Sequence, residues 1–352
     1  VPIQRESQTL ASTTFQNFFR LFKNLSGMTG TADTEAVEFK QIYGLDVVII
    51  PTNVPMIRDD LNDLVFLTKK AKYKALIEEI EEIRKRSAPI LVGTVSVDSS
   101  EQVSKLLKEK NISHQILNAK QHEMEAEVIA NAGKPGMVTI ATNMAGRGTD
   151  IVLGGRKDDQ SEEEWRSNNE IVLKAGGLHI LGTERHESRR IDNQLRGRSG
   201  RQGDIGESIF FLSLEDDLMR IFGSKTLENV LSKLGLKDGE VITHSMITKS
   251  LERAQQKVES HNFDMRKQIL KFDDILNDQR KIIYQNRKEI LNTNDQSKII
   301  EDMIDDYVNY IIEITIPPKK YSHEWDANFL KEKVREIFVI DIPASRLSLI
   351  HI

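Results

Sequence analysis

The chain has 352 residues, of which 39% are hydrophobic and 29% charged, so it is long enough to bury a large core and to form two or three domains. Its 49 basic and 54 acidic residues give a net charge of -5, which argues against a protein that coats nucleic acid through bulk positive charge. The absence of cysteine excludes disulfides and thiolate zinc sites, and the eight histidines form no His-x-x-x-His pair, so no metal centre is expected.

Neither a membrane span nor a secretory signal is expected. No uninterrupted apolar run approaches the ~18 residues that a spanning helix needs. The chain opens at Val1 inside polar, helix-like sequence, which suggests a fragment of a longer, cytosolic protein.

The N-terminal stretch is expected to form a helix, a loop of small residues, a second short helix and a strand. The expected elements are a helix over Val1–Leu25, the loop Ser26–Ala32, a short helix that contains Glu35 and Glu38, and a buried strand over Val47–Ile50. A linker then leads to a further strand over Leu64–Thr68.

After this stretch, apolar strands alternate regularly with amphipathic helices. The expected strands are Pro89–Thr94, His114–Leu117, Met137–Ala141, Leu178–Gly182 and Glu207–Ser213, and the expected helices are Lys69–Arg86, Ser99–Lys110, His122–Ala132 and Glu187–Leu195. The charged segment Arg156–Asn169 is expected to be an exposed insertion. Strands that are apolar on both faces and alternate with helices predict a parallel sheet covered by helices on both sides.

From Asp216 onward the sequence predicts helices only. One helix is expected over Leu218–Leu234, and Met246–Ile290 contains neither proline nor glycine, which predicts a helix about 65 Å long. A free coiled coil is the alternative for this helix, but the polar Gln279 interrupts its seam, so we favour a scaffold helix that packs against several domains. A smaller helical unit is expected after Asn292.

Arginines and glycines are concentrated in the segment Gln194–Asp204, QLRGRSGRQGD, which we call the arginine loop. The guanidinium groups of Arg196, Arg198 and Arg201 offer planar donor forks that match phosphate oxygens, and the glycines allow the backbone to approach a ligand closely. A solvated basic loop at a helix end is the alternative. The spacing Gln-x-x-Gly-Arg-x-Gly-Arg resembles the arginine-finger motif of the second RecA-like domain in helicase-type ATPases.

A second glycine-rich segment, Asn143–Asp150 (NMAGRGTD), follows a buried strand. Arg147 can reach a phosphate there and Asp150 can accept hydrogen bonds from a ribose, although a structural turn with Asp150 as a helix cap remains open. Both segments are expected at carboxyl ends of parallel strands, where ligands gather. The loop Ser26–Ala32 resembles the Ser-Ala-Thr loop that couples nucleotide state to domain movement in helicase-type motors, and a plain helix-to-helix loop is the alternative.

The chain contains no Gly-x-x-x-x-Gly-Lys-Ser/Thr phosphate loop, because Ser224 stands where Phe222–Thr226 would need glycine. The acidic run Glu215–Asp217 is interpreted as structural, since it follows the arginine loop rather than preceding it. Half of an ATP site is therefore expected, without the lysine and magnesium carboxylates of phosphoryl transfer. Four histidines, His114, His179, His186 and His261, are interpreted as packing or surface residues.

Taken together, the motifs resemble those of the SecA family, the motor ATPases of the bacterial preprotein translocase. The segments that carry the resemblance are Ala11–Arg20, Ser26–Ala32, Ala141–Gly155, Gly177–Asp192, the arginine loop and Val258–Gln268. Weaker similarity continues through Trp325, so that the resemblance covers nearly the whole chain.

The resemblance implies an α/β fold, in which a RecA-like parallel-sheet domain of the helicase C-terminal type precedes an all-α scaffold and wing region. It divides the chain into the tail of the first nucleotide-binding domain (1–44), the second nucleotide-binding domain (45–223), the helical scaffold (224–291) and part of the helical wing (292–352). The implied catalytic residues are Arg198 and Arg201, the implied nucleotide-binding residues are Gly146, Arg147, Gly148, Asp150 and Gln194, and no residue is implied to bind a metal.

In the family, ATP turnover drives preproteins through the SecYEG channel. The resemblance therefore implies ATP, with Mg²⁺ held by residues outside this chain, and no zinc site in it. The implied partners are SecYEG, preproteins, chaperone-delivered cargo, an anionic membrane surface and a possible second copy in a homodimer, with no nucleic acid. The implied location is cytoplasmic, at the inner face of the cell membrane.

Two alternatives remain beside this interpretation. The chain could be the C-terminal half of a superfamily 2 nucleic-acid helicase, but it shows no basic or aromatic stacking stripe. It could also be a non-catalytic regulatory module, because the chain alone lacks the Walker A and B motifs and is expected to hydrolyse no ATP.

Overall fold

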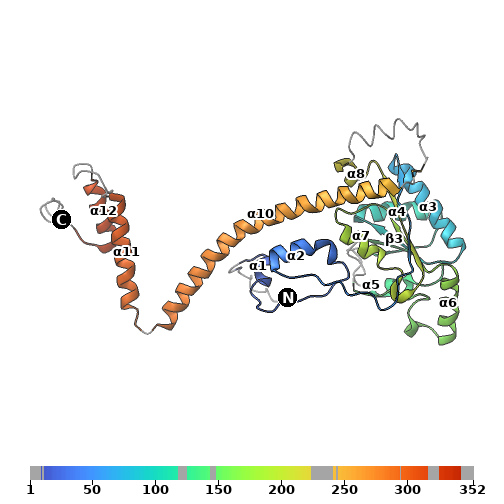
Figure 1. The fold of residues 1–352 in the computed structure, drawn as a ribbon, viewed down its shortest axis with the longest axis horizontal. Coiled ribbons are helices and arrows are strands. Elements are labelled where there is room, and N and C mark those ends of the chain that lie inside the picture. The colour runs from blue at the N-terminus through green and yellow to red at the C-terminus, as the bar shows by residue number, and fades with distance from the viewer. Residues whose placement is uncertain are drawn as a thin grey trace, which may run out of the picture. The chain divides into compact units, whose positions relative to one another are not determined.

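The computed structural model describes residues 9, 12–117, 125–142, 148–222, 241–242, 245–293, 295–315 and 325–341. The chain divides into two compact units, Val1–Asp273 and Asp274–Ile352 (Figure 1).

The first unit is built on a parallel sheet. Among the described residues it has seven strands, in the order β1-β7-β6-β3-β5-β4, with β2 also paired to β7. The strands are β1 (Asp59–Asp60), β2 (Leu64–Phe66), β3 (Ile90–Thr94), β4 (Gln115–Leu117), β5 (Val138–Thr142), β6 (Leu178–Gly182) and β7 (Gly206–Ser213). Every residue of β3, β5 and β6 is buried, because helices cover both faces of these central strands. The predicted α/β fold with a parallel sheet is confirmed.

Helices α3 (Lys69–Lys85) and α4 (Val97–Glu109) cover one face of the sheet. Helices α5 (Glu125–Ala132), α6 (Glu162–Lys174) and α7 (Arg189–Arg196) cover the other (Figure 1). Alternate residues of one strand therefore enter different cores: Val92 packs with α3 and α4, whereas Leu91 packs with α5 and α6. The helices α3, α4, α6 and α7 begin where a serine or threonine side chain accepts a hydrogen bond from a backbone N–H of the first turn.

The charged segment Arg156–Asn169 is largely exposed, as predicted, but the helix α6 that begins in it and continues to Lys174 was not predicted. Three glutamates in the first turn of α6 complement the positive end of the helix dipole, so the acidic composition favours the helix here. Trp165 fastens the helix to the preceding loop, since its indole N–H donates to the carbonyl oxygen of Gly155 at 3.0 Å.

Two predictions for the N-terminal stretch are wrong. Helix α1 (Phe15–Phe19) ends near Arg20, so Leu21–Leu25 is not helical, and the earlier part of the expected helix lies mostly outside the described residues. Val47–Ile50 forms no strand, and Val48 is 80% exposed, because no described strand lies beside this apolar run. The short helix is confirmed as α2 (Ala36–Tyr43), preceded by a 3-10 turn over Asp33–Glu35.

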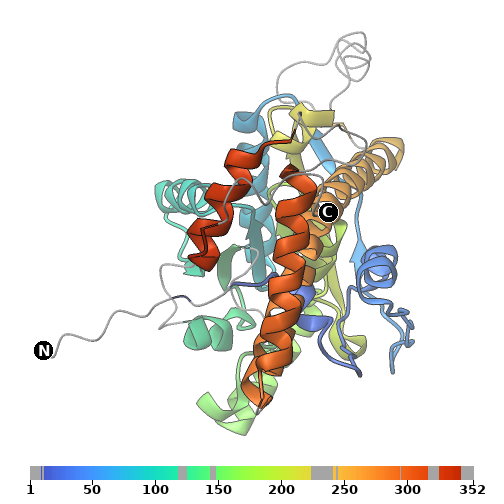
Figure 2. The same cartoon turned by 90° about the vertical axis from the view of Figure 1, so that its left-hand side faces the viewer.

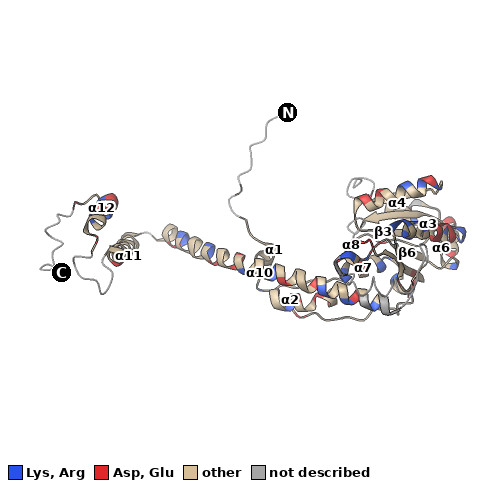
Figure 3. Cartoon of the chain, turned by 90° about the horizontal axis from the view of Figure 1, so that it is seen from above, with Lys and Arg blue, Asp and Glu red and all other residues tan. Residues whose placement is uncertain are grey.

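Helix α8 (Asp217–Phe222) follows the sheet, and the rest of the helix expected up to Leu234 lies outside the described residues. Helix α10 (Ser245–Asn292) confirms the long helix and carries acidic and basic residues along its length (Figure 3). Two of its contacts involve the N-terminal helices: Arg266 pairs with Glu38 of α2 at 2.6 Å, and Asp273 accepts a hydrogen bond from Thr14 Oγ1 at 2.7 Å. Such contacts favour the scaffold interpretation over a free coiled coil.

In the second unit, α11 (Ser297–Thr315) and α12 (Ala327–Phe338) lie side by side (Figure 2). Their contact includes the rings of Tyr307 and Phe338, whose centroids are 6.3 Å apart, and it buries Ile311 and Leu330. The helical unit predicted after Asn292 is thus confirmed. None of the helices in the described part of the chain is both long and apolar enough to cross a membrane.

Candidate functional site

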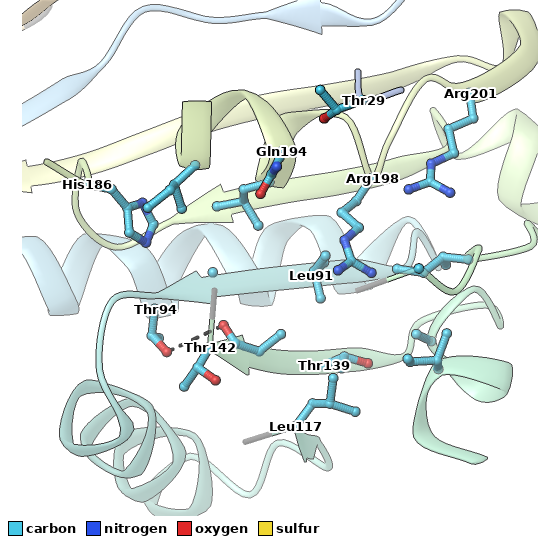
Figure 4. Close-up of a pocket in the computed structure, with 18 residues that line it drawn as sticks. Thr29, Leu91, Thr94, Leu117, Thr139, Thr142, His186, Gln194, Arg198 and Arg201 are labelled. Atoms are coloured by element: carbon cyan, nitrogen blue, oxygen red, sulfur yellow. Dashed lines mark hydrogen bonds between the residues drawn. The ribbon is translucent and has the colours of Figure 1, made fainter. Parts of the chain in front are cut away.

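A cleft of about 200 Å³ lies over the face of the sheet that carries α5 and α7 (Figure 4). Its lining residues come from β3, β4 and β5, from α5 and α7, from the segments after β5 and after β6, from the arginine loop and from the N-terminal loop. They are Thr29, Leu91, Gly93, Thr94, Leu117, Ile129, Ala132, Thr139, Ala141, Thr142, Gly148, Ile151, His186, Ile191, Gln194, Leu195, Arg198 and Arg201. The cleft therefore combines an apolar floor with two guanidinium groups.

The arginine loop is held in place by a residue of the linker before β1. Arg58 Nη1 donates to the carbonyl oxygens of Arg196 and Ser199, at 2.9 and 3.0 Å. Ser199 Oγ donates to the carbonyl oxygen of Leu178 in β6, at 2.6 Å. Gly200 has φ +70°, and a Cβ there would lie 2.5 Å from Cβ of Arg58, so this position requires glycine. The loop is thereby fixed against the sheet at the amino ends of β6 and β7. The expectation that it lies at the carboxyl end of a strand is wrong, because the loop follows α7 and leads into β7.

The three arginines of this loop have different surroundings. The guanidinium of Arg196 lies 5.1 Å from the ring centroid of Phe210 beneath the loop. Burial, together with the neighbouring charge of Arg185, lowers the pKa of Arg196 below its ordinary value. Arg198 and Arg201, by contrast, both line the cleft (Figure 4). Two of the three arginines therefore line the cleft, and the third packs on Phe210.

Arg201 connects the two glycine-rich segments. Its Nη1 donates to Asp150 Oδ1 at 2.5 Å, and its Nε donates to the carbonyl oxygen of Gly197 at 2.9 Å. Gly148, with φ +85°, lines the cleft beside them. Gly146 and Arg147, the other two expected binding residues of this segment, lie outside the described residues.

The N-terminal loop contacts the same helix that leads into the arginine loop. Gln194 of α7 donates from Nε2 to Thr31 Oγ1 at 3.2 Å, and Thr29 lines the cleft. At the start of α7, Ser188 Oγ donates to Glu35 Oε1 at 3.3 Å. The loop that resembles a Ser-Ala-Thr loop thus lies beside the cleft and contacts α7.

A buried network that the sequence did not predict joins these elements to α10. It consists of Asp63, Arg185, His186, Asp192 and Gln255. Arg185 Nη2 donates to both oxygens of Asp63, at 2.7 and 3.0 Å, and Arg185 Nη1 donates to Asp192 at 3.3 Å. Gln255 Nε2 donates to Asp192 Oδ2 and to the carbonyl oxygen of His186, both at 2.7 Å. These residues come from three distant parts of the sequence, around positions 63, 185–192 and 255, so no local motif could reveal the network.

The two carboxylates of the buried network respond differently to burial. For Asp63, burial raises the pKa above its ordinary value and outweighs the opposing charge of Arg185. For Asp192, burial also acts to raise the pKa, but the hydrogen bond from His186 and the charge of Arg185 outweigh it and lower the pKa.

A second link between α7 and α10 lies nearby, where Arg189 Nη2 pairs with Glu259 at 2.8 Å.

The acidic run after β7 has a structural role, in agreement with its interpretation from the sequence. Asp216 Oδ1 accepts from the fully buried Lys72 Nζ at 2.6 Å, and Lys72 also donates to the carbonyl oxygen of Thr183 at 2.9 Å. Burial raises the pKa of Asp216 to about 6, although the charge of Lys72 opposes the shift.

Across the described ranges, no group of three or more histidine, aspartate or glutamate side chains is placed to hold a metal ion.

Two DEAD-box proteins are among the solved structures to which part of this chain is similar. The E. coli DEAD-box protein SrmB, bound to regulator of ribonuclease activity A, is 18% identical, with a TM-score of 0.33 over 49% of this chain and 84% of that one. Domain 2 of the DEAD-box helicase Mss116p, bound to an RNA duplex, is 15% identical, with a TM-score of 0.33 over 56% of this chain and 68% of that one.

Sequence comparison gives a closer relationship. The chain is 54% identical to the protein translocase subunit SecA of Chromohalobacter salexigens over 357 residues, which cover 97% of this chain and 39% of the relative. It matches the SecA P-loop domain over residues 55–239, the SecA Wing and Scaffold domain over residues 241–351 and the SecA DEAD-like domain over residues 1–40. The first of these matches alone covers more than half of the sequence, and the chain therefore belongs to the SecA family.

Proposed function

We propose that this chain supplies the arginine side of an ATP site in a motor that moves preproteins. One observation carries the proposal: Gln194, Arg198 and Arg201 line the same cleft. There Arg201 also pairs with Asp150 of the second glycine-rich segment. Belonging to the SecA family supports the same function.

In this proposal Arg198 and Arg201 bind the phosphate oxygens of ATP. A guanidinium offers two parallel N–H donors to a phosphate, and its positive charge stabilises the charge that develops as the γ-phosphate leaves. Asp150 releases Arg201 when the nucleotide binds, and its carboxylate then accepts hydrogen bonds from the ribose. Gly146 and Gly148 allow the backbone to approach the nucleotide, and Arg147 and Gln194 complete the site.

The other half of the site belongs to residues outside this chain. Phosphoryl transfer needs a lysine that cradles the phosphates and carboxylates that hold Mg²⁺, and no such phosphate loop occurs in the 352 residues. In this proposal residues 1–44 are the tail of the first nucleotide-binding domain and residues 45–223 are the second. Residues 224–291 then form the helical scaffold and residues 292–352 part of the wing.

For the whole protein we propose the transport role of the family. ATP turnover changes how the two nucleotide-binding domains meet, and α10, which is bonded to α7 through Gln255 and Glu259, passes this movement to the preprotein and the SecYEG channel. Chaperone-delivered cargo, an anionic membrane surface at the cytoplasmic face and a homodimer are the further partners of this proposal.

A nucleotide titration of the chain tests the proposed site. We expect ATP to bind with a dissociation constant in the micromolar range, weakened about 10-fold by Asp150→Ala and by Arg198→Ala, because each removes one charged or hydrogen-bonded contact. Lys40→Ala, which removes an exposed ion pair with Asp46 away from the cleft, is the matched control and should bind as the unsubstituted chain does.

Turnover distinguishes the proposal from its alternatives. The chain alone is expected to hydrolyse no ATP above background, and turnover that Arg201→Ala abolishes would contradict this. In the whole protein, stimulation of turnover by channel-containing membranes with a preprotein supports the transport role. Stimulation by nucleic acid would instead support a helicase.

A further inference from the structure

One nitrogen of His186 is buried at the cleft without a hydrogen-bond partner. The residue is 4% exposed and lines the cleft, at the same end as Thr94 in Figure 4. Among the described residues, nothing accepts from or donates to its Nε2. Thr139 Oγ1 lines the same cleft and is also buried without a partner in the described part of the chain. Unmatched buried polar atoms are unfavourable, so a ligand that satisfies them is favoured.

The other side of the imidazole ring is firmly bonded. His186 Nδ1 lies 2.7 Å from Asp192 Oδ1, and the backbone N–H of His186 donates to the same oxygen at 3.0 Å. An ionised carboxylate can only accept hydrogen bonds, so Nδ1 carries the proton in this pair. In the neutral ring, Nε2 is then a hydrogen-bond acceptor at the edge of the cleft.

The carboxylate that orients this ring is itself held by helix α10. Asp192 Oδ2 accepts from Gln255 Nε2 at 2.7 Å and from Arg185 Nη1 at 3.3 Å. Gln255 is fully buried, and its Nε2 also donates to the carbonyl oxygen of His186 at 2.7 Å. One residue of α10 therefore contacts both the backbone of His186 and the carboxylate that fixes its side chain.

We propose that His186 is a ligand-contacting residue of the cleft, and that Asp192 and Gln255 couple its contact with the ligand to the docking of α10. The inference rests on the proposed nucleotide site. His186 Nε2 accepts a hydrogen bond from a donor that arrives with the nucleotide, either a hydroxyl group or an ordered water. Because the ring, Asp192 and Gln255 are hydrogen-bonded in series, nucleotide binding and α10 docking stabilise each other, and the coupling is equal in both directions.

Two substitutions separate the contact with the ligand from the support of the fold. In His186→Asn the side-chain amide can still donate to Asp192 as Nδ1 does, but no group remains where Nε2 faces the cleft. In His186→Ala both are lost. The inference predicts that the two variants bind ATP and ADP equally weakly, about 3- to 10-fold below the unsubstituted chain. It also predicts that only His186→Ala lowers the urea unfolding midpoint substantially.

Two further measurements report on the contact and on the coupling. We expect the ¹⁵N resonance of His186 Nε2, assigned by its loss in His186→Asn, to shift when ADP or ATP saturates the chain. We also expect nucleotide to slow amide hydrogen exchange in residues 251–262 of α10, and this protection to be lost in His186→Asn and in Gln255→Leu.

The outcomes of these measurements distinguish the role of His186 from the proposed nucleotide site itself. Nucleotide affinity of His186→Asn equal to that of the unsubstituted chain, with an unshifted Nε2 resonance, would overturn this inference and leave the nucleotide site intact. A shifted resonance without added protection in α10 would overturn the coupling. No binding of ATP or ADP by the unsubstituted chain would overturn the proposed function as well.

Discussion

Arg201 and Asp150 form an ion pair at 2.5 Å between the loop that joins α7 to β7 and the segment that follows β5, and their side chains are 38% and 61% exposed. Exposed pairs of this kind contribute only about 0–1 kcal/mol to stability, because water screens them and two side chains lose freedom. The pair is therefore easily opened. In the proposed nucleotide site, a phosphate group that approaches Arg201 would replace Asp150 at little cost to the stability of the fold.

Arg201→Ala should consequently separate activity from stability. We expect its free energy of unfolding to fall by less than about 1 kcal/mol. In the whole protein, ATP turnover should fall about 1,000-fold or more, because an arginine finger acts mainly on the transition state. Urea unfolding and steady-state turnover measure the two effects. Arg201→Lys, which keeps the charge but not the planar fork, should recover only part of the activity, and full recovery would argue against bidentate phosphate binding.

Removing one partner of the buried network should affect stability far more. Asp63 and Arg185 are both almost completely buried, so Asp63→Ala leaves the buried guanidinium without its two-pronged partner and with only the longer contact to Asp192 at 3.3 Å. We expect a loss of about 3–5 kcal/mol in the free energy of unfolding. Asp46→Ala removes the exposed pair with Lys40 and is the matched control, with an expected change below about 0.5 kcal/mol. Equal effects in urea unfolding would contradict the buried role of Asp63.

Asp216 should make stability depend on pH in the direction opposite to most carboxylates. Its folded pKa of about 6 lies above the ordinary value of 3.8, so between these values the folded chain binds a proton that the unfolded chain releases. Stability from this group is present at low pH and is lost as the pH rises through about 6, by on the order of 2–3 kcal/mol.

The variant Asp216→Asn isolates this contribution, because its amide does not titrate. The free energy of unfolding of the unsubstituted chain minus that of the variant should fall as the pH rises from 4 to about 6.5. A difference that grows over this range would mean that the charge of Lys72 outweighs the burial of Asp216.

Gly177 and Gly136 provide a matched pair of glycine substitutions. Both have positive φ, +78° and +65°, so alanine is strained at either position. At Gly136 the added Cβ meets nothing, whereas at Gly177 it would overlap the carbonyl oxygen of Ile205. We expect Gly136→Ala to cost about 1–2 kcal/mol of unfolding free energy, and Gly177→Ala to exceed ~3 kcal/mol. Similar unfolding midpoints would show that the Ile205 segment moves away freely.

The sheet could be predicted from the sequence because its central strands are apolar on both faces. Leu178–Gly182 was predicted with its observed limits, and the regular spacing of apolar residues in Lys69–Lys85 predicted α3. The same reasoning failed at Val47–Ile50, since an apolar run becomes a strand only where a partner strand lies beside it. The two-residue strand β1 was missed because two aspartates carry no apolar signal.

For the candidate site, sequence motifs identified the groups that face the cleft but not those that support them. Arg198 and Arg201 could be inferred because glycine and arginine recur at a characteristic spacing. His186 was interpreted only as a packing or surface residue, since a single histidine gives no indication of its neighbours. Its role depends on Asp192 in the next helix and on Gln255 far along the chain, which meet only after folding.

The pairing of β1 and β2 with β7 also bears on how the first unit folds. Leu64 is in register with Phe211, so the first two strands gain this partner only after almost the whole sheet has been synthesised. The strands β3, β4 and β5 lie closer together in sequence and can associate earlier, because closing a shorter loop costs less entropy. During synthesis, the segment from Asp59 to Phe66 therefore has no strand to pair with until β7 emerges from the ribosome.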